Sequence, residues 1–179
     1  EDSEPFRRAQ AQESPSSSMA IRDATYLHVI LPYALAQAHR HREPVSILQA
    51  GIDRISAIHE MLGPEQVTRA VNHVGEVMTR RLRASDVVSR MEDDRILAML
   101  PNATSSDACR IAHEIRAAVE ERCASLSDLP PLTTSIGVAS FPTNARDVDS
   151  LLNAADEAMS RAQQAGRNRV VVAEPWAGQ

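Results

Sequence analysis

Short apolar runs of strand length alternate along this chain with longer stretches in which apolar residues recur every three or four positions. The longer stretches predict amphipathic helices, because about 3.6 residues per turn brings those positions onto one face, and the short runs predict buried strands. Helices are predicted over residues 23–42, 53–61, 67–82, 108–119 and 148–162, and strands over 45–52, 87–91, 96–100, 132–142 and 169–173. This order predicts one sheet of about five strands, mostly antiparallel or mixed, flanked by helices, in the α/β or α+β class.

The length of the chain fits one such domain, since 179 residues bury roughly 70% of the surface that the unfolded chain exposes. Residues 1–18 contain almost no apolar side chains and end in prolines and serines, so they are predicted to form a flexible linker. The domain is expected to span residues 19–174, with a tail over 175–179. Because the sequence starts at Glu1 rather than at a methionine, we expect it to be part of a longer protein.

Charge and composition argue against several classes of function. The formal net charge is -5, whereas a general nucleic-acid clamp needs an excess of cations. No apolar run approaches the roughly 20 residues that cross a bilayer, so we expect a cytoplasmic protein without direct membrane contact in this part. Cys109 and Cys123 are too few for a disulfide scaffold or a four-cysteine zinc site and suit a reducing compartment. All 19 cations are arginine, which excludes chemistry that needs lysine.

Three segments carry a family resemblance. They are SRMEDDRILAMLP at residues 89–101, LTTSIGVASFP at 132–142 and LLNAADEAMSRAQQAGRNRVVV at 151–172. Their order and spacing resemble the GGDEF domain, the module of diguanylate cyclases, over roughly residues 22–173. The resemblance implies a nucleotide-cyclase-like fold and a role in bacterial signal transduction. Active members of the family condense two GTP molecules into cyclic di-GMP across a dimer, with Mg²⁺ bound beside each GTP.

The signature hairpin of the family is altered in this sequence. In the family, two glycines let the turn adopt positive φ and approach the nucleotide, and an acid that follows them binds the metal. Here acidic side chains stand at both glycine positions and would repel a triphosphate, and an arginine replaces the metal-binding acid. The five signature positions are Glu92, Asp93, Asp94, Arg95 and Ile96.

Other functional positions implied by the resemblance are also changed. Phosphoryl transfer depends on positioning and on charge neutralisation around Mg²⁺, so the combined losses predict a domain with no catalytic residues, no metal and no cofactor. Only Arg167 remains of the phosphate-binding cations. The replaced positions are Gly51 for a metal-binding Asp, His59 and Thr68 for the two guanine-binding residues, and Gln163 for a phosphate-binding Lys. In the family an Asp-Ile-Asp pattern follows the first strand, and here it reads Gly51, Ile52, Asp53. Its surviving acid, Asp53, is interpreted as a helix N-cap or first-turn acid rather than as a metal ligand.

One ligand site of the family keeps its residues. Many GGDEF domains carry an Arg-Xaa-Xaa-Asp product-inhibition site shortly before the signature, and Arg83 and Asp86 fall in that register. An arginine fork can pair with a phosphate or with the Hoogsteen edge of guanine, and a carboxylate can accept the guanine N1 and N2 hydrogens. The pair is expected to face solvent, with Arg80 and Arg116 as further candidates. The family often adds a second arginine from the neighbouring helix. That position is Glu114 here, so Arg116 would have to take its place.

Two functions follow as hypotheses. The first is a catalytically inactive GGDEF domain that acts as a cyclic di-GMP receptor and signals to an attached domain or a partner protein. The alternative is a dimerisation or protein-interaction module that binds no nucleotide, in which Arg80, Arg81 and Arg83 form a solvated cluster that complements the helix dipole. A homodimer is compatible with both.

Overall fold

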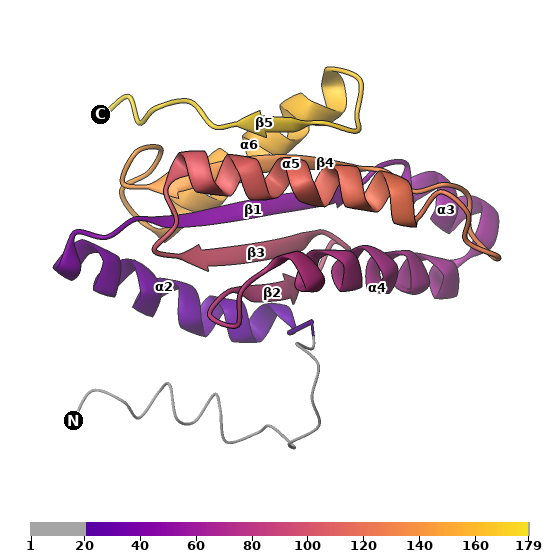
Figure 1. The fold of residues 1–179 in the computed structure, drawn as a ribbon, viewed down its shortest axis with the longest axis horizontal. Coiled ribbons are helices and arrows are strands. Elements are labelled where there is room, and N and C mark those ends of the chain that lie inside the picture. The colour runs from indigo at the N-terminus through magenta and orange to yellow at the C-terminus, as the bar shows by residue number, and fades with distance from the viewer. Residues whose placement is uncertain (1–20, 179) are drawn as a thin grey trace.

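The computed structural model describes residues 21–178, which form a five-stranded sheet with helices on both faces (Figure 1). The predicted linker at residues 1–18 lies outside this range. The helices are α2 (Ala24–His41), α3 (Ile55–Leu62), α4 (Pro64–Arg81), α5 (Ser105–Arg122) and α6 (Val148–Gln164). The strands are β1 (Val45–Ile52), β2 (Val87–Arg90), β3 (Ile96–Pro101), β4 (Thr134–Phe141) and β5 (Val170–Val172).

The sheet is mixed, as predicted, and has the strand order β2-β3-β1-β4-β5. Strand β1 is central and pairs antiparallel with β3 and β4, and Ile47 lies opposite Met99 on one side and Ala139 on the other. Strand β5 pairs parallel with β4 at the far edge. The hairpin of β2 and β3 forms the other edge, so the signature turn lies at one end of an edge hairpin.

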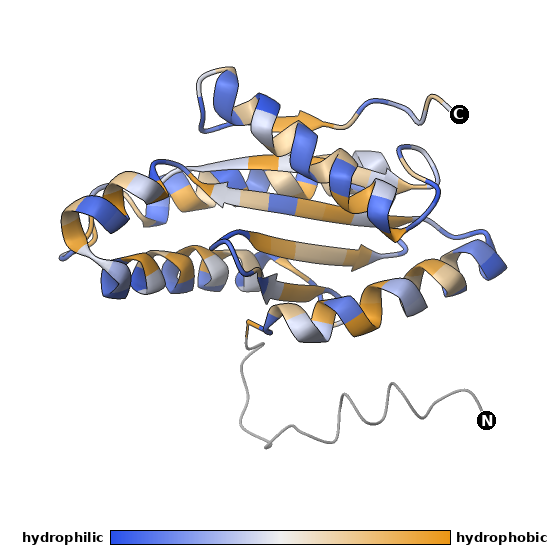
Figure 2. Ribbon diagram, turned by 180° about the vertical axis from the view of Figure 1, so that it is seen from behind, coloured by the Kyte–Doolittle hydropathy of each residue, from blue (hydrophilic) through white to orange (hydrophobic). Residues whose placement is uncertain are grey.

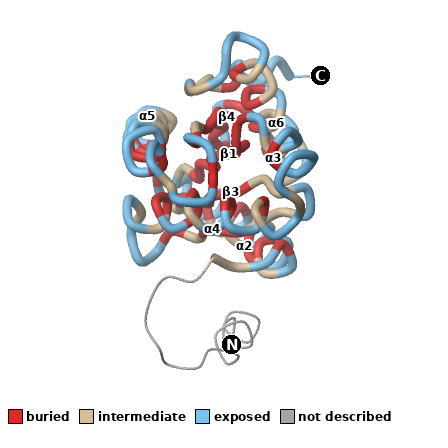
Figure 3. The backbone as a smooth tube through the Cα atoms, turned by 90° about the vertical axis from the view of Figure 1, so that its right-hand side faces the viewer, coloured by how far each residue is buried: buried red, intermediate tan, exposed pale blue. Residues whose placement is uncertain are grey.

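Two apolar layers cover the two faces of the sheet. One contains buried residues of α3, α4 and α5, and the other contains those of α2 and α6. Figure 3 shows the buried strands in the middle, with α5 on one side and α6 on the other. In Figure 2 hydrophobic residues follow the strands and the inner faces of the helices. The apolar faces of the helices predicted from the sequence therefore do pack against the sheet.

Local signals set most element ends. Asp23, Thr104 and Asp147 cap α2, α5 and α6 by accepting backbone N–H groups with their side chains. Pro32 was expected to kink the first helix or to mark its first turn; it lies in the interior of α2, so the second option is wrong. Both cysteines are free, and burial raises the pKa of the Cys123 thiol, which fits a structural role.

The end of the chain stays attached to the domain as far as it is described. The Trp176 N–H donates to the Thr143 carbonyl at 2.9 Å, two residues beyond the expected boundary at 174. Within residues 21–178, no helix combines the length and the apolar character that crossing a membrane requires.

Candidate functional site

The signature turn is held by ion pairs among its own side chains and to α6. Arg90 pairs with Asp94 at 2.5 Å, and Arg95 pairs with Asp93 and with Asp156 of α6. Asp94 has φ 64°, in the left-handed region that glycine adopts most easily. The left-handed residue is thus at the third signature position, and neither Glu92 nor Asp93, at the two glycine positions, has a positive φ. The Arg95 guanidinium is balanced by two carboxylates.

Gly51, at the position of a family metal ligand, lies against α6. A Cβ at this glycine would meet Gln163 Nε2 at 2.8 Å and Met159 Sδ at 3.0 Å. The space beside the end of β1 is therefore filled by side chains of α6, one of which stands at the phosphate-lysine position. Across residues 21–178 the structure brings together no group of three His, Cys, Asp or Glu residues that could hold a metal ion.

Asp53 is not a helix cap, which corrects the interpretation from the sequence. Helix α3 begins at Ile55, its N-cap Arg54 has φ 61° without a side-chain cap, and its first turn holds no acid. The Asp53 carboxylate instead lies at the start of β4, where two hydroxyl groups donate to it. It accepts hydrogen bonds from Thr133 Oγ1 and Ser135 Oγ, both at 2.7 Å. Only 7% of the residue is exposed.

A backbone donor extends this contact to α5. The N–H of Asn168, in the loop before β5, donates to Asp53 Oδ2 at 2.9 Å. The Asn168 side chain accepts from Arg116 at 3.0 Å and donates to Glu120 at 2.8 Å. Hydrogen bonds from Asn168 and then from Arg116 lower the pKa of Glu120. We call Asp53, Asn168, Arg116 and Glu120 the Asp53 network; the sequence gives no signal for it, because its members are far apart along the chain.

The remaining positions that the resemblance assigns to the nucleotide site lie on three different elements. His59 and Thr68 are exposed on α3 and α4, and Arg167 is exposed in the loop before β5 with φ 64°. Their assignment to a nucleotide site stays a prediction.

Arg83 and Asp86 do come together in the turn between α4 and β2. The backbone N–H of Arg83 donates to Asp86 Oδ2 at 2.8 Å, and Arg83 Nε lies 3.7 Å from the same oxygen. The two side chains differ sharply in exposure, at 59% for Arg83 and 1% for Asp86. The expectation that both face solvent is therefore wrong for Asp86, because its carboxylate turns inward to accept the Arg83 N–H. Burial raises the pKa of Asp86, outweighing the lowering effect of Arg83.

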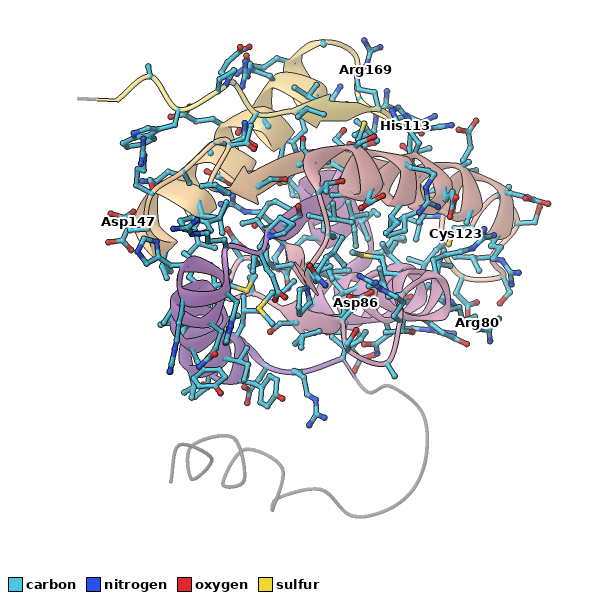
Figure 4. All side chains as sticks on the ribbon, turned by 60° about the vertical axis from the view of Figure 1, so that its left-hand side comes forward. Arg80, Asp86, His113, Cys123, Asp147 and Arg169 are labelled. Atoms are coloured by element: carbon cyan, nitrogen blue, oxygen red, sulfur yellow. The ribbon has the colours of Figure 1, made fainter. Side chains whose placement is uncertain are left out.

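The two further candidates differ in how they relate to this turn. Arg80 of α4 pairs with Glu76 at 2.6 Å. In Figure 4 Arg80 lies at the edge of the molecule, whereas Asp86 lies toward its middle. Arg116 belongs to the Asp53 network, so it does not join Arg83. Arg110 of α5 acts on the same carboxyl as Arg83: hydrogen bonds from Thr104 lower the pKa of Asp107, and the charges of Arg110 and Arg83 lower it further. Arg116 lies six residues further along α5, about 9 Å along the helix axis.

The chain matches one family model and has clear relatives. The model described as "Diguanylate cyclase, GGDEF domain" matches residues 21–169. Diguanylate cyclase DosC of Escherichia coli (strain K12) is 31% identical over 148 residues, which cover 81% of this chain and 32% of DosC. The chain spans about a third of the length of this curated relative.

Solved structures agree with the fold. The GGDEF domain of PA1120 (YfiN or TpbB) from Pseudomonas aeruginosa superposes with a TM-score of 0.77 at 29% identity, over 88% of this chain and 99% of that one. The coiled coil and GGDEF domain of DgcB from Caulobacter crescentus, in complex with c-di-GMP, gives a TM-score of 0.78 over 94% of this chain and 88% of that one. At 22% identity, the second match shows the fold alone.

Proposed function

The chain belongs to the GGDEF family of diguanylate cyclase domains, and we propose that it is a catalytically inactive member that acts as a receptor for cyclic di-GMP. In this proposal Arg83 contacts the ligand and Asp86 positions Arg83. Occupancy of the site is passed to an attached domain or a partner protein.

The absence of catalysis is supported by the poor fit of Mg²⁺ to the family's metal positions. Gly51 offers no carboxylate, and Met159 and Gln163 occupy the space where one would extend. Arg95 stands at the position of the other acid and is already paired with Asp93 and Asp156. A guanidinium repels a divalent cation, so the site lacks the charge that holds the metal and stabilises phosphoryl transfer.

We expect this chain to make no cyclic di-GMP from GTP with Mg²⁺ or Mn²⁺, as measured by chromatography against a protein-free blank. Restoring both signature glycines, with Glu92→Gly and Asp93→Gly together, should leave it inactive because Gly51 and Arg95 still deny the metal its ligands. An active family member assayed in parallel verifies the conditions. Turnover by either form of this chain would refute the assignment of the metal positions.

The observation that carries the receptor proposal is the geometry of Arg83. Its backbone is fixed by the 2.8 Å hydrogen bond to Asp86. One terminal nitrogen of its guanidinium donates to the Pro101 carbonyl at 3.3 Å, and 59% of the side chain is exposed beside the Asp86 carboxylate. A planar fork held in this way can pair with a phosphate or the Hoogsteen edge of guanine at a reduced cost in side-chain order. Arg80 and Arg110 are exposed on α4 and α5, where each is paired with a glutamate, Glu76 and Glu114 respectively.

Calorimetric titration with cyclic di-GMP tests this reading, with GTP as the control ligand. We expect a micromolar or tighter Kd and a loss of about tenfold or more for Arg83→Ala, since a charge-assisted hydrogen bond contributes about 1.5–3 kcal/mol. Asp86→Ala should raise the Kd for cyclic di-GMP by a similar factor. Asp86→Asn should recover much of that affinity, because an amide oxygen still accepts the Arg83 N–H.

The matched control is Arg146→Ala. Arg146 and Asp149 have the same Arg-Xaa-Xaa-Asp spacing at the start of α6, outside the register of the ligand site, so this change should leave the Kd unaltered. Absence of heat and of any shift in melting temperature at millimolar cyclic di-GMP would reject the receptor function.

The interaction-module alternative is favoured by one feature of α3. Met61 is 80% exposed and Leu62 is 46% exposed, next to the proline pair Pro130 and Pro131 across a shared cavity. Exposed apolar side chains that cluster in this way are typical of contact surfaces. This reading takes the place of the receptor function if the titration with cyclic di-GMP fails.

A further inference from the structure

A small cavity lies between the signature turn, α2 and α6, at the other end of β2 from the turn that holds Arg83. Its volume of about 350 Å³ falls within the range of small-molecule sites, which is about 300–1,000 Å³. Residues of the two helices and of the signature turn form its walls, and Gln49 of the central strand β1 also lines it. This residue gives the cavity its most unusual feature.

Gln49 is a polar side chain in the middle of an apolar sheet. Side chains alternate along β1, and its neighbours Leu48 and Ala50 belong to the layer of α3, α4 and α5. Gln49 therefore faces α2 and α6. The residues opposite it on the neighbouring strands are Leu97 and Gly137, and neither offers a polar side chain.

The Gln49 amide has no hydrogen-bond partner within residues 21–178. Only 7% of the residue is exposed, yet neither of its two amide atoms is fully enclosed. The small open part of Gln49 thus includes the amide, on the side where the residue lines the cavity. An amide that is largely buried without a partner is costly, and a ligand that bonds to it in the cavity would remove that cost.

The charges around the cavity indicate which kind of ligand fits. Its walls contain three carboxylates and one guanidinium. The guanidinium of Arg95 is already shared by Asp93 and Asp156. The Glu92 carboxylate is exposed and has no ion-pair partner in the described part of the chain. The walls therefore carry a net negative charge, which disfavours phosphate and carboxylate ligands and favours a cation.

The rest of the walls favours an organic cation over a metal ion. Residues 21–178 bring together no group of three His, Cys, Asp or Glu residues that could hold a metal. Met91 of the signature turn and Leu152 of α6 add half-buried apolar surface to the cavity. A guanidinium group suits such a site because it is flat and weakly hydrated, so it can donate from its edge while its faces contact apolar groups.

We propose that this cavity binds a small alkylguanidinium cation, which donates an N–H to the side-chain oxygen of Gln49 and places its charge near Glu92. The alkyl group packs against Met91 and Leu152. The site requires neither cyclic di-GMP nor a metal and does not involve Arg83, so it stands or fails independently of the receptor function.

Propylguanidinium and propylurea test the proposal on the full chain, because they share a shape and differ in a charged nitrogen against a neutral oxygen. Titration followed by methyl NMR should give propylguanidinium a Kd of about 1 mM and propylurea a Kd at least about fivefold higher. Intermolecular NOEs should connect the propyl protons with the Met91 and Leu152 methyl groups. Equal affinities for the two probes, or NOEs only to other parts of the chain, would overturn the proposal.

Gln49→Met separates this site from the general attraction of cations to an acidic protein. Methionine keeps the unbranched shape of glutamine and removes the amide, so the chain should fold and the Kd for propylguanidinium should rise at least about fivefold. Gln164→Met, the same change at an exposed residue at the end of α6, should leave that Kd unaltered. An unaltered Kd in Gln49→Met would reject the assigned contact.

Glu92→Gln keeps the test decisive if Gln49→Met does not fold, because Glu92 is exposed on the signature turn. Removal of its charge should weaken the binding of propylguanidinium and leave that of propylurea unchanged. The same effect on both probes, or none on either, would contradict the proposal. Cyclic di-GMP titration of these variants reports separately on the Arg83 site.

Discussion

Replacing Gly137 by alanine is expected to destabilise the chain by about 3 kcal/mol, at the upper end of the usual cost of overpacking. A Cβ at this position of β4 would meet backbone atoms of α6, at 2.1 Å from the Ala155 carbonyl oxygen and 2.4 Å from the Met159 nitrogen. Backbone cannot move aside as a side chain does, so α6 as a whole must shift. Strand preference alone would predict that alanine stabilises the chain, because glycine weakens the interior of a strand.

Gly51→Ala is the matched control, one strand away under the same helix. There the nearest atoms are the ends of the flexible Gln163 and Met159 side chains, which can rotate, so the loss should stay below about 1 kcal/mol. Urea unfolding of the two variants and the wild type gives both values. Equal stabilities for the two variants would show that β4 and α6 are not in close backbone contact.

This contact gives a physical reason for the strongest part of the family resemblance. The SIGVA run supplies the glycine, and the helix in AADEAMSRAQQAG supplies small residues, among them Ala155 and Ala158, that let the two backbones meet. Helix α6 in turn carries Asp156, Met159 and Gln163 to the altered nucleotide site. The resemblance in these two segments therefore has a basis in packing between β4 and α6.

The fold could be predicted largely from local patterns. The run VSILQAGI corresponds residue for residue to β1, and the apolar stripe of the last helix matches α6, because burial of a face imposes a strict period. Each hairpin strand differs from the prediction by one residue at its C-terminal end: β2 ends at Arg90 instead of residue 91, and β3 continues to Pro101 instead of ending at residue 100. Pairing across the sheet, rather than local preference, sets such ends.

The site was harder to predict because its chemistry depends on contacts between distant residues. The sequence placed Arg83 beside Asp86 correctly but gave no sign that one side chain would be exposed and the other buried. It gave no sign that Arg95 pairs with Asp156, which is 61 residues away. The partners of Asp53 leave no pattern along the chain, because they come from distant segments.

Asp53→Ala is the second change with a large expected effect, a loss of about 3 kcal/mol or more in the free energy of unfolding. The carboxylate accepts three hydrogen bonds, from Thr133, Ser135 and Asn168, and its removal leaves those donors without their acceptor in a buried place. Bonds to a charged acceptor contribute about 1.5–3 kcal/mol each, and part of the loss is recovered when water enters. Asp149→Ala, an exposed carboxylate in the first turn of α6, should cost well under about 1 kcal/mol.

Hydrogen exchange shows whether the loss at Asp53 arises from the predicted contacts. If the carboxylate holds the loop before β5, the Asn168 amide should exchange faster in Asp53→Ala by more than the change in global stability explains. Asn168→Ala keeps that amide but cuts the side-chain bonds to Arg116 and Glu120, so it should loosen the end of α5 while the amide stays protected. Arg167, the neighbour of Asn168, has a left-handed conformation, so the hydrogen bond between the Asn168 N–H and Asp53 also restrains the backbone at Arg167. A protected Asn168 amide in Asp53→Ala would mean that the loop is held by other contacts and that Asp53 acts only on the ends of β1 and β4.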